Sequence, residues 1–335
     1  MNIAELGEFA FIDRLCEPFE VKNAEFTAFG CGDDAAVIEA NDKFILTSVD
    51  MFMEGVHFDL IYTPFKHLGF KCVVAAGSDI LAMNGTVKQI MVAIALSSRF
   101  TVEQIDEFYE GVKAACDKYG IDLVGGDTSA SLTGLAITIT ATGEVDKDKI
   151  TYRSGAKNSD LICVTSDLGA AYLGTKLLDR EKRVLRGNDV AKPKLDGYEY
   201  PLERALKPLL RKDVIDMLGE SNIVPTSMID LSDGLASDLK HICKSSQCGA
   251  KIFLERIPIN SKCFDLAEEL NEDPVVAVMN GGDDYELMFT VGVDKYEQVA
   301  RLGGINIIGH IIEDKLEVLV TPEGGEIAIK AQGWK

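Results

Sequence analysis

The sequence lacks the features that identify several common classes of protein. Its eight cysteines include no C-x-x-C pair and no short Cys/His grouping, and its four histidines are dispersed without an H-E-x-x-H motif. Several cysteines lie in apolar runs, which favours small buried side chains in a reducing compartment over disulfides or zinc. No segment approaches 18 apolar residues, and no basic region followed by an apolar stretch opens the chain. We therefore predict a soluble, cytoplasmic protein that does not bind membranes.

Positive charge is also scarce. The chain has 34 Lys and Arg against 54 Asp and Glu, a formal net charge of −20. Nucleic acids and anionic membranes are bound by basic surfaces, so neither is an expected partner. An anionic substrate would need metal cations between itself and this protein.

The familiar phosphate-binding motifs are missing as well. There is no G-x-x-x-x-G-K-[ST], no G-x-G-x-x-G after a strand, and no protein-kinase H-R-D or D-F-G set. No Ser/His/Asp or Cys/His arrangement indicates a covalent nucleophile, so we expect none.

Helical and strand patterns alternate in both halves of the chain. At 335 residues and 47% hydrophobic composition, the chain has material for about two domains. The fold class is therefore α/β or α+β. We predict strands at 44–52, 89–96, 134–145 and 161–167, helices at 63–83, 101–120 and about 169–180, a strand-to-helix turn at 228–242, and a helix, acidic turn and strand at 275–291. The polar segment 144–160 is the predicted linker, and 181–200 has no periodicity and is a predicted surface excursion.

Two of the predicted helices carry start signals. Thr63 as N-cap before Pro64 predicts the first helix, and Thr101 with Gln104 forms a capping box for the second. Gly120 ends that second helix. Its inner stripe is predicted to be Val102, Ile105, Val112 and Cys116.

A series of acidic turns carries the chemistry. Asp-Gly pairs commonly make turns, so any one of these segments alone is weak. Their recurrence and the apolar residues around them favour ligands for a cation. The segments are GCGDDAA (30–36), SVD (48–50), SD (78–79), GGDTS (125–129), DLSDG (230–234) and GGDDYE (281–286).

Asp79 and Asp50 stand out on physical grounds. Asp79 has only alanine and methionine at i±3 and i±4 of its helix, where a carboxylate is costly unless it is paired or binds a cation. The alternative is a buried ion pair with Lys71 or Lys88. Asp50 ends a predicted buried strand, where an apolar residue would be expected.

Two further turns suit phosphate and its metal. Gly126 and the glycine before it let a phosphate approach the backbone beside Asp127. Asp230 and Asp233 flank Ser232 at a helix start, although Ser232 could equally be a plain N-cap. Oxygen ligands without His or Cys favour Mg²⁺.

In this order, the motifs resemble those of the thiamine-monophosphate kinase family. The resemblance rests on sequence segments along nearly the whole chain: GEFAFIDRL (7–15), GDDAAV (32–37), SVD, SDILAMNG (78–85), GGDTS, YRSGAKNSD (152–160), MIDLSDGLASDLKHI (228–242), GGDDYELMFTV (281–291) and the final Gly-Trp. The family shares its fold with aminoimidazole ribonucleotide synthetase, selenophosphate synthetase and a hydrogenase maturation protein.

The resemblance implies phosphorylation of thiamine monophosphate by ATP with several Mg²⁺ ions, in a homodimer. It implies an N-terminal ATP- and magnesium-binding domain with a mixed sheet that dimerises, 1–148, and a C-terminal α/β domain that completes the site, 149–335. The implied metal ligands are Asp34, Ser48, Asp50, Asp79, Asp127, Asp230 and Asp233. The implied ATP contacts are Tyr109, Gly126, Asp127, Arg153 and Ser232, and the implied thiamine contacts are His57, Asp283 and Trp334.

The sequence also departs from the family pattern. Ala130 stands where the family has Arg, which removes one expected phosphate contact, and the Asn of the family's NLSD motif is absent before Ser78. We assign no role to 181–200. Three alternatives remain. The shared fold allows selenophosphate synthesis, for which Cys31 is the one thiol worth testing, or aminoimidazole ribonucleotide synthesis. Ala130 favours the third, an inactive nucleotide-binding relative.

Overall fold

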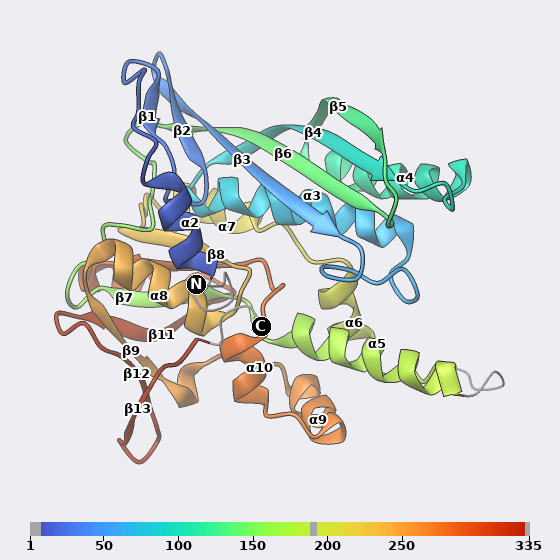
Figure 1. The fold of residues 1–335 in the computed structure, drawn as a ribbon. Helices are drawn as coiled ribbons and strands as arrows, with labels where there is room; N and C mark the ends of the chain where they lie inside the picture. Colours follow the sequence, from blue (N-terminus) through green and yellow to red (C-terminus); the bar gives the residue numbers. More distant parts are fainter. Residues whose placement is uncertain (1–7, 188–192, 332–335) are drawn as a thin grey trace.

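The computed structural model describes residues 8–187 and 193–331, which form two mixed β-sheets with associated helices (Figure 1). The first sheet has the strand order β1-β2-β3-β6-β4-β5, and the second has the order β13-β12-β9-β11-β7-β10-β8. The predicted α/β or α+β class is therefore confirmed.

The first sheet is built from the N-terminal half of the chain. Neighbouring strands are antiparallel except for β4 and β5, which run parallel. Its strands are β1 (Thr27–Phe29), β2 (Ala36–Ala40), β3 (Lys43–Met53), β4 (Thr86–Leu96), β5 (Asp122–Ala130) and β6 (Ala136–Asp146). Helix α2 (Glu8–Cys16) precedes them, and α3 (Phe65–Ala82) and α4 (Val102–Tyr119) are inserted between them.

Helix α3 runs along one face of this sheet (Figure 1). Thirteen of its 18 residues are buried, as expected for a helix between a sheet and other elements. It packs closely against α4, because a Cβ added to Gly111 would lie 1.9 Å from the carbonyl oxygen of Lys66. This central position brings Asp79, near the end of α3, to the junction of the two sheets.

The opposite face of the first sheet is exposed. Strand β3 alternates, so that Leu46 and Phe52 are buried while Val49 and Met51 are 65% and 60% exposed. Met91 on β4, at 43%, is exposed as well. We call this surface the open sheet face.

The second sheet is built from the C-terminal half and is antiparallel except for β9 with β12. Its strands are β7 (Leu161–Thr165), β8 (Ser227–Leu231), β9 (Gly249–Phe253), β10 (Glu286–Val291), β11 (Ile305–Ile312), β12 (Glu317–Val320) and β13 (Glu326–Ala328). The associated helices are α5 (Ala170–Gly187), α6 (Glu199–Leu206), α7 (Lys212–Glu220), α8 (Leu235–Ser246), α9 (Ser261–Leu270), α10 (Pro274–Asn280) and α11 (Tyr296–Val299), with short 3₁₀ turns at Leu254–Arg256 and Val293–Lys295.

One hydrophobic cluster joins the two halves. It includes Val73 and Ile80 of α3 together with Val214 of α7 and Phe289 of β10, each 0% exposed. The segment 147–160 between β6 and β7 carries no helix or strand, but Thr151 N donates a hydrogen bond to Met83 O. The sheets therefore share packing at the place where α3 meets β8 and β10.

Most predicted elements are present, and the differences lie at their ends. Pro64 rather than Thr63 is the N-cap of α3, because Pro64 has an extended ψ of 140° and the helix begins one residue later. Val102 is 72% exposed, so its assignment to the inner stripe of α4 is wrong. Helix α5 continues to Gly187, into the segment predicted to be a surface excursion.

None of the helices within 8–187 and 193–331 combines the length and apolarity that crossing a membrane requires.

The capping box at the start of α4 is confirmed. Gln104 N donates to Thr101 Oγ1 at 3.3 Å, and Thr101 N donates to Gln104 Oε1 at 3.1 Å. Removing an N-cap hydroxyl costs about 1 kcal/mol. We therefore expect Thr101→Ala to lower the free energy of unfolding in urea by about 1 kcal/mol. Val102→Ala, at the adjacent exposed position, is the control and should change it little; equal losses would contradict this account of the cap.

Candidate functional site

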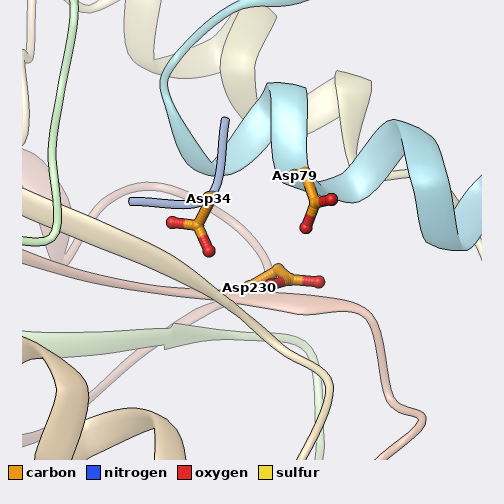
Figure 2. Close-up of side chains that lie close together, drawn as sticks. All are labelled: Asp34, Asp79 and Asp230. Carbon is orange, nitrogen blue, oxygen red and sulfur yellow. The ribbon is translucent and has the colours of Figure 1, made fainter. Parts of the chain in front are cut away.

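Three carboxylates from distant parts of the chain meet at the junction of the sheets. Asp34 lies in the loop before β2, Asp79 on α3 and Asp230 on β8, and each offers one carboxylate oxygen within 4.8 Å of the others. Figure 2 shows the three side chains directed towards a common space. The loop, the helix and the strand each supply one ligand group, so the cluster exists only in the folded chain.

Burial and mutual repulsion raise the pKa values of these carboxyls. Burial and then the charges of Asp50 and Asp230 hold the pKa of Asp79 well above its usual range. Burial, followed by the charge of Asp34, raises the pKa of Asp230 to about 7, and burial raises that of Asp50 to about 6. Without a bound cation, ionisation of all these carboxyls together is unfavourable, because they are buried and their like charges repel.

The donor set fits a hard divalent cation. Its ligand atoms are carboxylate oxygens, and Asp34 Oδ2 is buried without a hydrogen-bond partner among the described residues. A divalent cation would satisfy that oxygen and reverse the repulsion that raises the pKa values. The sequence-based alternative for Asp79 does not occur, because Lys71 pairs with Asp283 at 2.9 Å and Lys88 with Glu144 at 3.4 Å.

Arg153 binds the cluster from one side. Its guanidinium donates to Asp34 Oδ1 from Nε at 3.1 Å and from Nη2 at 2.5 Å, and its backbone N–H donates to Asp33 at 3.1 Å. Burial, and then the charge of Asp34, raises the pKa of Asp33 to about 7. Arg153 therefore fixes the loop that carries Asp34 against the segment between the two sheets.

The residues around Asp50 and Asp79 are held by short polar contacts. Ser48 Oγ donates to Ala76 O at 3.2 Å, which ties β3 to α3. Ser78 Oγ donates to Ala75 O at 2.8 Å and also forms a short hydrogen bond with Asp230 Oδ2. Sequence reasoning did not identify Ser78 as part of the site, although it directly precedes Asp79.

The turn after β8 presents Ser232 and Asp233 to the same region. The N-cap of α8 is Gly234, with φ of 109°, so the alternative that Ser232 is a plain N-cap is wrong. Asp238 within α8 accepts hydrogen bonds from Asp233 N at 3.3 Å and Gly234 N at 3.1 Å. Ser232 and Asp233 are therefore left facing the cavity described below.

The acidic turn before β10 carries Asp283 in an unusual backbone conformation. Asp283 and Tyr285 have φ of 61° and 51°, a region that favours glycine. Lys71 Nζ donates to Asp283 Oδ2 at 2.9 Å, and Tyr285 Oη donates to Asp283 Oδ1 at 2.8 Å. Burial raises the pKa of Asp283, but the Lys71 ammonium and these hydrogen bonds bring it below the usual value, so Asp283 stays ionised.

A buried ion-pair network supports that turn. Glu286, 0% exposed, pairs with Arg204 at 2.5 Å and also with Arg211. Asp284 accepts from Gly169 N at 2.7 Å and lies 3.7 Å from Arg204. Sequence reasoning missed these residues, because Asp284 and Glu286 look like further members of the acidic turn while their partners lie some 75 to 115 positions away.

One cavity of about 870 Å³ is lined by Asp79 and Asp230 of the cluster and by both acidic turns. Ligand cavities of this size are typical of enzymes with small substrates. The predicted site residues that line it are Asp50, His57, Asp79, Asp230, Ser232, Asp233 and Asp283. His57 Nδ1 accepts a hydrogen bond from Met53 N at 2.9 Å. Burial lowers the pKa of His57, and the charge of Asp283 partly opposes that shift.

Asp127 lies away from this cavity within the same chain. The strand register places Asp127 opposite Ala93, Ala93 opposite Thr138, and Thr138 opposite Met51. Three strand spacings separate Asp127 from β3 by about 14 Å. This row of side chains lies on the open sheet face, whereas Asp50 pairs with the fully buried Ile139 on the other face.

Two further predicted ATP contacts, Gly126 and Tyr109, also lie outside the cavity lining. A Cβ on Gly126 would lie 1.9 Å from Val92 O, so packing against β4 alone already requires glycine there. Tyr109 lies on α4, partly buried, with its ring against Phe108 at a centroid distance of 5.4 Å. Trp334 lies outside the described residues.

The N-terminal part of the chain is similar to AIR synthase-related proteins. The family model for the AIR synthase related protein, N-terminal domain, matches residues 32–145, which contain the first sheet from β2 to β6. A solved structure described as AaThiL complexed with AMPPCP and TMP aligns over 100% of this chain and 98% of its own, with a TM-score of 0.84 and 28% identity.

More specifically, the chain belongs to the thiamine-monophosphate kinase family. It is 33% identical to the thiamine-monophosphate kinase of Bacillus subtilis over 91% of this chain and 92% of that protein. It is 31% identical to the enzyme of the same name from Synechococcus elongatus over 100% of this chain and 97% of that protein. The family resemblance and the expected fold are thus confirmed.

The raised pKa values predict how a divalent cation and pH act together on stability. Carboxyls with folded pKa values of about 6 to 7 bind protons that the unfolded chain, with pKa near 4, has already released. Without a divalent cation, the fold should lose stability as pH rises from about 6 to about 8.

Magnesium, which replaces those protons, should raise the thermal midpoint more at the higher pH. Thermal denaturation at both pH values, with and without Mg²⁺, measures this. Asp230→Asn should reduce both the pH dependence and the magnesium shift; a shift that is equal or larger at pH 6 would contradict the assignment.

Proposed function

We propose that the protein transfers the γ-phosphoryl group of ATP to thiamine monophosphate, giving thiamine diphosphate and ADP. Membership of the thiamine-monophosphate kinase family supports the reaction. The structural observation that carries it is the cluster of Asp34, Asp79 and Asp230, with oxygens within 4.8 Å, at a cavity of about 870 Å³. We place the enzyme in the cytoplasm.

Magnesium ions are the proposed cofactor, held by Asp34, Asp79 and Asp230 with Ser48, Asp50 and Asp233 nearby. When bound, they would neutralise charge on the phosphate oxygens of both substrates. Arg153 holds Asp34 through two hydrogen bonds, and its charge partly offsets the burial that raises the pKa of Asp34. These contacts leave further guanidinium N–H groups of Arg153, together with the Ser232 hydroxyl, for ATP.

The acceptor needs positioning more than activation. The phosphate of thiamine monophosphate is already a nucleophile at neutral pH, so transfer proceeds directly and in line, without a covalent enzyme intermediate. Asp283, held in place by Lys71 and Tyr285, and His57 line the part of the cavity proposed for the cationic thiazolium. Trp334, the third proposed thiamine contact, would add an aromatic face.

We infer that the enzyme acts as a homodimer whose partner completes the ATP site. Asp127 lies on the open sheet face, on a strand about 14 Å from β3, which is too far for it to share a phosphate-bound ion with Asp50 of the same chain. Gly126 precedes it on β5. Val49, Met51 and Met91 are exposed apolar side chains on that face. A second copy of the chain would cover such a face in a homodimer. Tyr109 of α4 is a further proposed ATP contact.

The dimer also gives each half of the chain a role. Residues 1–148 would bind ATP and magnesium and form the dimer, and residues 149–335 would complete the site through Asp230, Ser232, Asp233 and Asp283. Ala130, the last residue of β5, marks where one family phosphate contact is missing. It is the one observation that favours an inactive nucleotide-binding relative.

A coupled ADP assay separates these functions. We expect Mg²⁺-dependent ADP release with thiamine monophosphate and none with free thiamine. ATP binding without this release would indicate the inactive relative. ADP release with a formylglycinamidine ribonucleotide would indicate aminoimidazole ribonucleotide synthesis instead, and AMP release with selenide would indicate selenophosphate synthesis.

Asp79→Asn and Asp50→Asn should each reduce turnover at least 100-fold, because each removes a charge that the metal requires. The thermal midpoint should not fall, since both carboxylates raise the electrostatic free energy of the folded state. Asp216→Asn, at an exposed position on α7, is the control. Near-normal turnover in Asp79→Asn would contradict the metal assignment.

The shared ATP site predicts complementation between two inactive variants. A chain with Asp127→Asn and a chain with Asp230→Asn should each be inactive as homodimers. When they are co-expressed, half of the dimers are mixed and each mixed dimer has one intact site, so roughly a quarter of wild-type activity should return. Mixed dimers, verified by two affinity tags, that remain inactive would contradict a site shared between subunits.

A further inference from the structure

The cavity extends beyond the carboxylates to a second group of polar side chains. Its floor is α5, from which Thr175, Asp179 and Lys182 line the cavity. Their spacing of four and three residues places them on one face of the helix. Asp59 and Tyr62, from the loop after β3, also line the cavity, and Figure 1 shows this loop near α5.

Contacts within this group fix its geometry. The Tyr62 hydroxyl lies near the Asp179 carboxylate, and the Lys182 ammonium forms an ion pair with Asp59. Asp59 also accepts from Ile61 N at 2.9 Å, and Lys182 Nζ lies 5.9 Å from the centre of the Tyr62 ring. Burial, and then the nearby Asp179 charge, raise the pKa of Tyr62, so its hydroxyl keeps its proton.

This group is separated from the acidic turn by a definite length of helix. A Cβ added to Gly281 would lie 2.6 Å from Tyr172 Cβ, which places the beginning of α5 against the turn that carries Asp283. Asp179 lies seven residues further along α5, about 10 Å at 1.5 Å per residue. A substrate whose phosphate is at the carboxylate cluster therefore extends its other end towards Asp179.

The two acidic groups at this end differ in their charge balance. Asp59 forms an ion pair with Lys182. By contrast, Asp179 forms no ion pair among the described residues and has the neutral Tyr62 hydroxyl and, beyond ion-pair distance, the Lys176 charge near it. An ionised carboxylate is an acceptor only, with about four lone-pair sites, and the Tyr62 hydroxyl can donate to at most one of them. Asp179 is therefore suited to a ligand group that donates N–H.

We propose that Asp179 is a specificity-determining residue, which accepts a hydrogen bond from the exocyclic amino group of the substrate's aminopyrimidine ring. Tyr62 is the positioning residue that holds the Asp179 carboxylate towards the cavity. This inference rests on the proposed function, because the aminopyrimidine belongs to thiamine monophosphate. It adds to the proposed thiazolium contacts a second point of recognition, at the far end of the molecule.

The test compares two acceptors, thiamine monophosphate and oxythiamine monophosphate, in which an oxo group replaces the amine. The wild-type enzyme should prefer thiamine monophosphate in kcat/KM by at least about tenfold. Asp179→Asn, whose amide can donate to the oxo group, should lower this preference about tenfold, mainly by raising KM for thiamine monophosphate. Tyr62→Phe should lower it in the same direction with kcat and the KM for ATP preserved.

Asp216→Asn is the matched control, an aspartate 55% exposed and paired with Lys212 at 2.6 Å. An unchanged preference in Asp179→Asn, or an equal change in the control, would overturn the inference while leaving the proposed function intact. If Asp179→Asn does not fold, an unchanged preference in Tyr62→Phe would overturn it. A wild-type enzyme that does not phosphorylate thiamine monophosphate would overturn both.

Discussion

The mutual repulsion of three buried carboxylates is the constraint around which this structure is organised. Asp34, Asp79 and Asp230 come from a loop, a helix and a strand, and their oxygens lie within 4.8 Å of one another. Burial raises their pKa values, so the arrangement is costly at neutral pH and must be held by the rest of the fold. A hydrophobic cluster that spans both sheets supplies that support, and a divalent cation would turn the cost into binding free energy.

The surrounding charges are arranged in two groups with different tasks. Near the cluster, Arg153 forms an ion pair with Asp34, and its charge also lowers the pKa values of Asp79 and Asp230 without offsetting their burial, so much of the negative charge remains for a metal. Below the acidic turn, Glu286 is fully compensated by Arg204 and Arg211, and removing one partner of such a buried pair is strongly destabilising. The second network therefore keeps Asp283 in its left-handed conformation, where Lys71 can reach it.

Much of this could be predicted from the sequence, and the limits have physical reasons. Capping residues and periodicity are local, so the boundaries of α4 and the strand-to-helix turn at Asp230 were predicted closely. The exposure of Val102 depends on which face of α4 meets α3, which is not a local property. The Arg204–Glu286 and Tyr62–Asp179 contacts link residues over 80 positions apart, and the separation of Asp127 from Asp50 follows from strand order. Motif order alone predicted seven metal ligands in one group; within the chain the structure clusters Asp34, Asp79 and Asp230 and places Asp127 away from them.

The central claim is that the carboxylates of Asp34, Asp79 and Asp230 share divalent cations during phosphoryl transfer. Anomalous diffraction from crystals grown with Mn²⁺ and a non-hydrolysable ATP analogue tests it most directly, because manganese accepts the same oxygen ligands as magnesium. The account predicts manganese peaks within direct coordination distance of all three carboxylates, with analogue phosphate oxygens completing the shell. A bound analogue with manganese elsewhere, and none at these carboxylates, would contradict it.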